Sequence, residues 1–153
     1  MYILAILAVL IAVVLNATFS GGLGGVMAYF DVFSLILVLI LVIPLMISAG
    51  LMKDFGRAFS FAIGKKQATN LNEINRSIVA VKMAMNASLA GGGFLFLCSV
   101  IQILHQYMEP AKLGPNVSVA IITMIYALVI ALLLLPVKAK LEIQKLEYMQ
   151  RDE

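Results

Sequence analysis

The sequence predicts an all-α membrane protein with four transmembrane helices, and three observations indicate this fold class. First, 63% of the 153 residues are hydrophobic, whereas a soluble domain is about 45–50% apolar. Second, four apolar stretches have close to the roughly 20 residues with which a helix crosses the hydrocarbon core of a bilayer. Third, none of these stretches carries a charged residue in its middle. We place them at residues 2–20, 32–51, 87–106 and 117–137.

The first stretch, residues 2–20, is expected to be a retained helix. It is too long and too uniformly apolar for a cleaved signal peptide, it lacks a basic start, and no obvious small-residue cleavage site follows it. The run Gly21-Gly22-Leu23-Gly24-Gly25 then predicts a flexible turn on the outer side of the membrane.

Asp31 stands immediately before the second stretch, at the outer mouth of the predicted bundle. An acidic side chain there accepts the unpaired amide hydrogens of the first helical turn and complements the positive end of the helix dipole. We therefore expect Asp31 to cap the second helix. Capture of ions at the outer mouth is the alternative role.

Beyond residue 51, aromatic and aliphatic residues continue at helical spacing, so we expect the second helix to leave the membrane and run to Gly64. Asn70-Leu71-Asn72-Glu73 then resembles a capping box. Apolar residues repeat every three or four positions after it, which predicts one continuous helix over residues 71–106. The second and third helices thus extend into the cytoplasm as a short hairpin, and residues 1–153 form a single domain.

Basic residues decide the predicted orientation, because cytoplasmic loops carry an excess of Lys and Arg. Six lie between the second and third helices and four follow the fourth helix, whereas the other two connections hold only Lys112. Both termini are therefore expected in the cytoplasm. Lys65-Lys66 is expected to be solvated close to anionic lipid headgroups. The ten residues are Lys53, Arg57, Lys65, Lys66, Arg76, Lys82, Lys138, Lys140, Lys145 and Arg151.

Several uncharged features lie within the apolar stretches. Pro44 and Pro136 predict local kinks, with a gating hinge as the alternative. Gly91-Gly92-Gly93 is expected to let two helices approach closely, with a hinge as the alternative. Polar side chains at membrane depth are expected to face other helices rather than lipid; they are Asn16, Ser48, Ser99, Gln102, Thr123 and Tyr126.

The sequence offers little for catalysis, so we do not expect an enzyme. Cys98 is the single cysteine and His105 the single histidine, which leaves too few ligands for a metal site and no internal disulfide. Nucleotide-binding loops, catalytic triads and nucleic-acid motifs are not found. We expect no cofactor and no nucleic-acid partner.

The run from Leu113-Gly114-Pro115-Asn116 through Thr123, Tyr126, Ala131, Pro136 and Lys140-Leu141-Glu142 resembles the fourth helix of the MotA/TolQ/ExbB proton-channel family, with its flagellar stator branch the most similar. The segment Tyr29-Phe30-Asp31-Val32-Phe33-Ser34 is similar to the start of the second helix in that branch. Glu109-Pro110, ahead of the fourth helix, also fits the pattern. The similarity covers the second to fourth helices, and the first helix is generic.

This resemblance implies a ring-forming subunit in a bacterial inner membrane. In that family about five such subunits surround two copies of a MotB-like partner, a single transmembrane helix with an intramembrane aspartate that takes up and releases the proton. The present chain would then be a homopentamer, or a similar ring, that drives movement of the partner. The resemblance places Thr123, Tyr126 and Pro136 in the ion pathway or its gating, with Ser99 and Gln102 as secondary candidates.

Two departures from the family pattern bear on this hypothesis. The large cytoplasmic domain of flagellar stator subunits is replaced here by a short connection. In addition, Leu95-Phe96 and Thr123-Met124 stand where the family has polar residues that face the proton-carrying aspartate, and Phe96 and Met124 cannot hydrogen-bond water. An unsatisfied polar group in hydrocarbon costs several kcal/mol. The second hypothesis is therefore a non-conducting structural ring or scaffold that has kept the fold.

Overall fold

The computed structural model describes residues 2–28, 31–64, 70–105 and 110–151. This part of the chain is all-helical, as predicted, and contains five helices. They are α1 (Tyr2–Ala28), α2 (Val32–Ser48), α3 (Met52–Ala62), α4 (Leu71–His105) and α5 (Pro110–Arg151).

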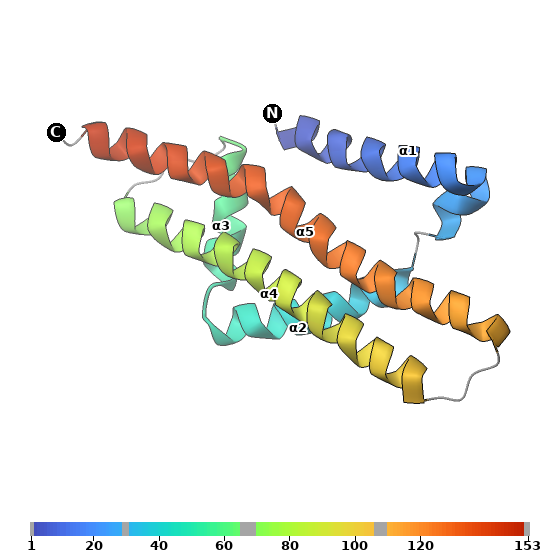
Figure 1. Ribbon diagram of the computed structural model, residues 1–153. Coiled ribbons are helices and arrows are strands. Elements are labelled where there is room, and N and C mark those ends of the chain that lie inside the picture. The colour runs from blue at the N-terminus through green and yellow to red at the C-terminus, as the bar shows by residue number, and fades with distance from the viewer. Residues whose placement is uncertain (1, 29–30, 65–69, 106–109, 152–153) are drawn as a thin grey trace.

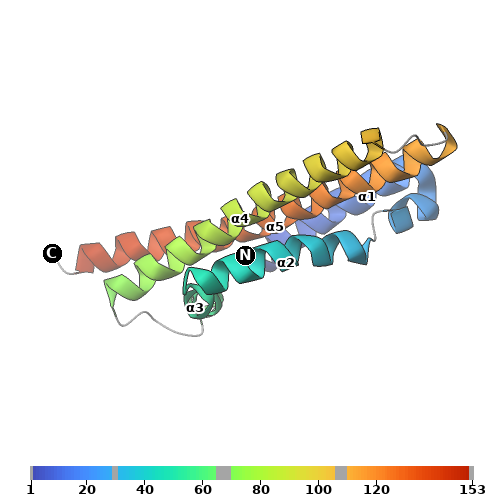
Figure 2. The ribbon, with the colours of Figure 1, turned by 90° about the horizontal axis from the view of Figure 1, so that it is seen from below.

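The long helices α4 and α5 run antiparallel and form the centre of the molecule (Figure 1). At 1.5 Å per residue their 35 and 42 residues extend about 50 and 60 Å, which exceeds the roughly 30 Å of a hydrocarbon core. Helix α5 lies between α4 and α1, and α2 packs under this layer (Figures 1 and 2). Helix α3 crosses the end of the α4–α5 pair that carries the basic residues.

Two of the described helices, α4 and α5, are long and apolar enough to cross a membrane. The pair α2 and α3 also has the length and composition of a span, but it is bent by 103° at its break. In α1 the described side chains define a shorter apolar helix, Ile6–Asn16. The composition of these helices indicates a membrane protein, while the four-span topology and the side of each terminus stay predictions.

The prediction that the second helix continues straight to Gly64 is wrong. Gly50 adopts φ +65°, the left-handed conformation that glycine tolerates best. The amide of Gly50 donates to the carbonyl of Ile47 at 2.9 Å, and that of Leu51 donates to the carbonyl of Met46 at 3.1 Å. This pair of bonds is the Schellman motif that ends helices. Consequently α3 leaves at a steep angle, and residues 52–62 form a separate helix rather than a continuation of α2.

The predicted turn at Gly21–Gly25 is also wrong, because α1 continues through these residues to Ala28. A helical glycine costs only about 1 kcal/mol relative to alanine. In an apolar environment an unpaired backbone amide costs more, so the helix retains its internal hydrogen bonds.

The third predicted helix is confirmed as one continuous element, α4. Asn70 caps it through Oδ1, which accepts from the amide of Asn72 at 3.0 Å. Helix α5 is longer than the predicted span 117–137: it starts with Pro110, whose missing amide hydrogen is tolerated in a first turn, and ends at Arg151. Glu109 and Lys65-Lys66 lie outside the described residues.

The close approach predicted for the glycine run is present at two of its three positions. A Cβ atom on Gly92 would lie 2.2 Å from Cβ of Ala127 on α5, and one on Gly91 would lie 3.4 Å from Cδ1 of Leu41 on α2. A Cβ atom on Gly93 would meet no atom within 4 Å. Small residues therefore set the distance between α4 and its neighbours, as they do in many membrane helix pairs.

Candidate functional site

Three of the predicted site residues come together where the start of α2 packs against α5. Ser34 donates from Oγ to Oδ2 of Asp31 at 2.6 Å, and Thr123 donates from Oγ1 to Oγ of Ser34 at 3.0 Å. The amide of Asp31 donates to the hydroxyl of Tyr126 at 3.0 Å. We call Asp31, Ser34, Thr123 and Tyr126 the α2–α5 polar cluster.

The local sequence explains how α2 presents its half of this cluster. Asp31 is the N-cap, as predicted, and its Oδ1 accepts from the amide of Phe33 at 3.1 Å. Ser34 lies one turn further on, so the second carboxylate oxygen reaches its hydroxyl. One carboxylate thus satisfies a backbone amide of the first turn and a buried side chain.

The two hydroxyl groups that join the helices are buried. Thr123 of α5 is 3% exposed and Ser34 of α2 is 0% exposed. The Thr123 hydroxyl also lies 3.1 Å from the carbonyl of Val119, one turn earlier in its own helix. The hydroxyl groups therefore form a short chain that ends on a carboxylate, and within this chain of residues the Thr123 side chain is directed to α2 rather than to an open surface.

The remaining site candidates lie elsewhere. Ser99 donates to the carbonyl of Leu95 in its own helix at 2.9 Å, and Gln102 is exposed near the end of α4. Pro136 is 13 residues from Thr123, about 20 Å along α5. The hydrogen bonds described for the α2–α5 polar cluster join Asp31, Thr123 and Tyr126. None of these bonds involves Ser99, Gln102 or Pro136.

Phe96 and Met124, the apolar residues at positions where the resemblance implies polar ones, are both half-buried. The Sδ atom of Met124 would lie 3.8 Å from a Cβ atom placed on Gly92, so Met124 borders the close contact between α4 and α5. Its role in this single chain is therefore packing between the two long helices.

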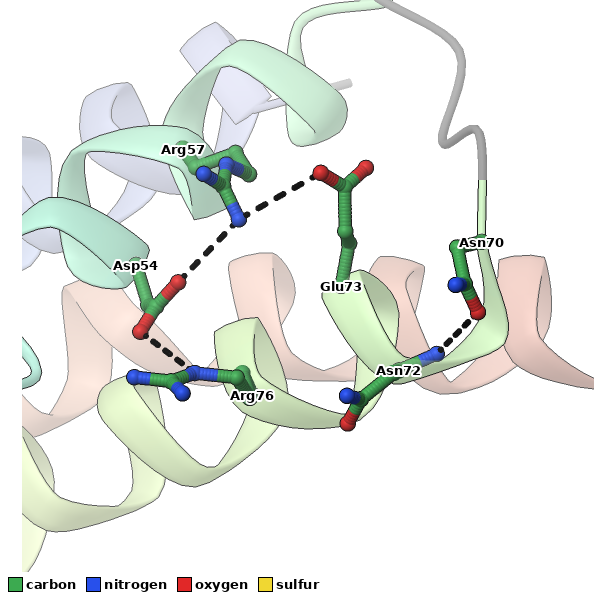
Figure 3. A network of polar contacts seen from close by, with 6 residues as sticks. All are labelled: Asp54, Arg57, Asn70, Asn72, Glu73 and Arg76. Atoms are coloured by element: carbon green, nitrogen blue, oxygen red, sulfur yellow. Dashed lines mark hydrogen bonds and ion pairs between the residues drawn. The ribbon is translucent and has the colours of Figure 1, made fainter.

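A second polar group, which the sequence interpretation missed, joins α3 to α4 (Figure 3). Asp54, in the first turn of α3, has a side chain that is 5% exposed. Its Oδ1 lies 3.2 Å from Nη1 of Arg57, and its Oδ2 accepts from Nε of Arg76 on α4 at 2.9 Å. Arg57 also lies 3.6 Å from Glu73. A carboxylate one turn after a helix-ending glycine was the available signal, because acidic residues favour the first turn of a helix.

The other end of α3 is held by α5. Lys140 donates from Nζ to the carbonyl of Ala62, and Gln144 donates from Nε2 to the carbonyl of Phe61 at 3.2 Å. The last carbonyls of a helix have no partner within the helix, and a positive charge complements its negative end. Helix α3 is thus fixed at both ends by side chains of the two long helices.

The chemistry available at these sites is hydrogen bonding and charge pairing. The described residues contain no group of three or more His, Cys, Asp or Glu side chains that could hold a metal ion. Cys98 is half-buried with no disulfide in the described part of the chain. The polar cluster combines a carboxylate with three hydroxyl groups, which suits it to fix helix register or to hold a small cation or water at the end of α2.

Comparison with protein-family models, with curated protein sequences and with solved structures finds no match to this chain. The functional conclusion therefore rests on the residues themselves.

Proposed function

We propose that this chain is a ring-forming membrane subunit that surrounds a single-helix partner and uses an ion gradient, most simply of protons, to drive movement of that partner. The ring supplies an uncharged protein wall, and the partner supplies the intramembrane carboxylate that binds and releases the ion. Both termini and α3 lie on the cytoplasmic side in this proposal.

The observation that carries the proposal is the chemistry of the α4–α5 pair. The two helices pack at the distance set by Gly92 and Ala127, and their apolar segments carry no carboxylate or amine. A titratable acid in a bilayer is costly when charged, so protonation changes its contacts with surrounding helices. Such a switch requires an acid from another chain, because these spanning segments have none.

The exposed face of α4 supports the proposed depth in the membrane. Between Asn72 and Asn86 this face carries polar or charged residues at four of five positions, whereas from Ala90 to Leu104 it is apolar apart from Gln102. The boundary near residues 86–90 matches the predicted start of the span at residue 87. The network around Asp54 then lies just outside the hydrocarbon core, and its two arginines are partly exposed while they pair with the buried carboxylate.

The α2–α5 polar cluster lies further along the pair than this boundary. The contact of Gly92 with Ala127 places Thr123 level with residue 96 of α4, inside the predicted span 87–106. In the proposed assembly the cluster would lie beside the ion pathway at the N-terminus of α2, where a carboxylate with a chain of hydroxyl groups is able to attract cations and the same bonds hold α2 against α5. Thr123 and Tyr126 would act in this part of the pathway.

The proposal is tested by flux through the purified native complex in proteoliposomes, with an imposed membrane potential and an entrapped pH-sensitive dye. We expect proton uptake that falls with Thr123→Ala and persists with Thr123→Ser, which keeps the hydroxyl. Ser34→Ala removes the same interhelical bond without changing Thr123, so it separates a packing effect from a pathway effect. The proposal would be overturned if a complex that contains the partner showed neither proton flux nor sodium flux.

A non-conducting ring or scaffold is the second candidate, and one observation favours it. The exposed side chains on the membrane half of α4 are apolar apart from Gln102 and His105, and they include Phe94, Leu97, Ile101 and Leu104. A lumen lined by them would exclude water. A native complex whose mass corresponds to several copies of the chain and no second protein, and which shows no ion flux, would support this second function.

A further inference from the structure

Helix α3 lies almost at right angles to the helices that have the composition of membrane spans. It is bent by 103° from α2. Helix α2 in turn runs along the α4–α5 pair, because Ser34 near its start bonds to Thr123 of α5. Further along α2, Leu41 lies beside Gly91 of α4. In Figure 2 these helices run lengthwise, while α3 is seen nearly end-on. With α4 and α5 across a membrane, the axis of α3 is therefore close to the membrane plane.

The polar contacts of α3 set its level along the long-helix pair. It is bonded to Arg76 of α4 and to Lys140 of α5. In the register given by the contact of Gly92 with Ala127, residue 140 is level with residue 79 of α4, and the end of the apolar span 117–137 is level with residue 82. These bonds therefore lie about 4–9 Å beyond the end of that span. The headgroup layer adds about 5–8 Å on each side of the hydrocarbon core, so α3 lies at the level of the headgroups.

The charges of α3 exclude a path through the hydrocarbon core. Lys53, Asp54 and Arg57 fall within its first six residues. Asp54 is buried between two arginines, whereas Lys53 is exposed. Charged side chains are costly inside a bilayer. Helix α3 is thus not the second half of a broken span, and one of its sides must face a polar environment.

One ion pair fixes which flank of α3 is turned towards the bilayer. Nη1 of Arg57 lies 3.6 Å from Oε1 of Glu73. Glu73 precedes Arg76 on α4 by three residues, so it lies further from the predicted span 87–106. Arg57 therefore marks the flank that faces away from the membrane. Positions two residues before and after Arg57 are about 160° away around the helix, so Phe55 and Phe59 lie on the flank that faces the bilayer.

This second flank is apolar along the whole helix. Met52, Phe55, Phe59 and Ile63 are separated by three, four and four residues, and we call them the α3 apolar flank. The rings of Phe55 and Phe59 meet edge to face, with 5.1 Å between their centroids. Both phenylalanines are half-buried against the core, but Met52 and Ile63 remain 46% and 56% exposed. An aromatic and aliphatic flank beside a basic one is typical of helices that lie in a membrane interface.

We propose that α3 is an interfacial helix whose apolar flank inserts among the phospholipids of the adjacent leaflet, with Lys53 among the headgroup phosphates. Lipid is the occupant because the direction, level and rotation of α3 all turn this flank towards the bilayer that surrounds the spans. Side chains extend about 5–6 Å from a helix axis, so the flank reaches the edge of the hydrocarbon core. This inference goes beyond the proposed function: it needs the membrane spans, but neither a ring nor ion flux.

The test is fluorescence quenching of the purified full chain in vesicles of equal parts phosphatidylcholine and phosphatidylglycerol. A bimane label is attached to one cysteine in a Cys98→Ala background, at Met52→Cys or Ile63→Cys on the flank, or at Lys53→Cys as the adjacent exposed control. The quenchers are iodide on both sides of the vesicles and phosphatidylcholine with a nitroxide on the acyl chain close to the headgroup. We expect the lipid nitroxide to quench both flank labels, and iodide to quench them at least about fivefold less than the label at residue 53.

A label inside the bilayer separates a failure of this inference from a failure of the spans. Ile40→Cys, at an exposed position of α2, is expected to be protected from iodide and quenched by a nitroxide near the chain end. With residue 40 protected, equal iodide quenching at residues 52, 53 and 63 would place the flank in water and overturn the inference. Flank labels that neither quencher reaches would show that protein covers α3, which also overturns it. Strong iodide quenching at residue 40 would reject the spans and this inference together.

Discussion

Arg76 of α4 donates a hydrogen bond from Nε to Oδ2 of Asp54 on α3, with 2.9 Å between the two atoms. The residues are 22 positions apart, with Asp54 in the first turn of α3 and Arg76 in α4. The bond fixes the N-terminal end of α3 to the long-helix pair, while Lys140 and Gln144 fix its C-terminal end. Helix α3 is therefore held against the two long helices by polar contacts at both of its ends and by apolar contacts between them.

The first prediction concerns the contacts of Asp54 at the N-terminal end of α3. Asp54→Ala removes the acceptor of two arginines, and we expect a loss of about 1–3 kcal/mol of stability, because hydrogen bonds to a charged, buried group are stronger than neutral ones but both arginines are partly exposed. Thermal unfolding in detergent, followed by circular dichroism, measures the loss. Glu73→Gln is the control: its ion pair with Arg57 is longer and more exposed, so a change below about 1 kcal/mol is expected. Equal effects of both variants would contradict the assignment of Asp54 as the main contact.

The second prediction tests the close contact of α4 and α5. Gly92→Ala places a methyl group 2.2 Å from Cβ of Ala127, so the helices must separate, at an expected cost of about 1–3 kcal/mol. Gly93→Ala is a matched control on the next position, where the methyl group meets no atom within 4 Å; a neutral effect, or a gain of up to about 1 kcal/mol from helix propensity, is expected. Ala127→Gly should restore part of the stability lost in Gly92→Ala. A destabilised Gly93→Ala and a neutral Gly92→Ala would show that the helix pair has a different register.

The third prediction separates the buried hydroxyl chain from exposed hydroxyl groups. Ser34→Ala leaves the Thr123 hydroxyl with only the Val119 carbonyl and takes a donor from Asp31, so a loss of about 1–3 kcal/mol is expected. Ser118→Ala, which removes an exposed bond to the carbonyl of Gly114, is expected to change stability by less than about 0.5 kcal/mol. Denaturation of the detergent-solubilised protein compares the two. Similar small effects would mean that the α2–α5 polar cluster does not hold the helices together.

The fourth prediction concerns the C-terminal end of α3. Lys140→Met keeps the aliphatic length but removes the donor to Ala62, with an expected cost of about 0.5–2 kcal/mol. Lys138→Met removes a helix-surface pair with Glu142 at 3.8 Å and is expected to cost at most about 0.5 kcal/mol. Hydrogen exchange of the α3 amides should rise with Lys140→Met and stay unchanged with Lys138→Met. Faster exchange in both would point to a general effect of charge.

The comparison of sequence and structure shows which features periodicity is able to predict. The cap at Asp31, the continuous helix α4 and the close packing at Gly91 and Gly92 are local features, and the sequence predicted each of them. The break at Gly50 was missed because Phe55 and Phe59 continue the helical spacing across it. Periodicity gives the face of a helix but not its direction after a left-handed glycine.

The polar contacts required knowledge of helix register. Thr123 and Ser34 are 89 positions apart, and Lys140 and Ala62 are 78 positions apart. Only the antiparallel packing of α4 and α5 against α2 and α3 brings these side chains together. The sequence identified Asp31, Thr123 and Tyr126 as candidates one at a time, and the structure shows that they share one hydrogen-bonded cluster.

The central proposal is that this chain forms a ring, with no charged residue in the middle of its spanning segments, around a companion helix that carries the titrating acid. Native mass spectrometry of the complex, released from its own membrane in mild detergent, tests this claim most directly. We expect a mass that corresponds to several copies of the 16.6 kDa chain together with a smaller protein that has one transmembrane segment and a central aspartate. A single copy of the chain with no second protein would contradict the claim.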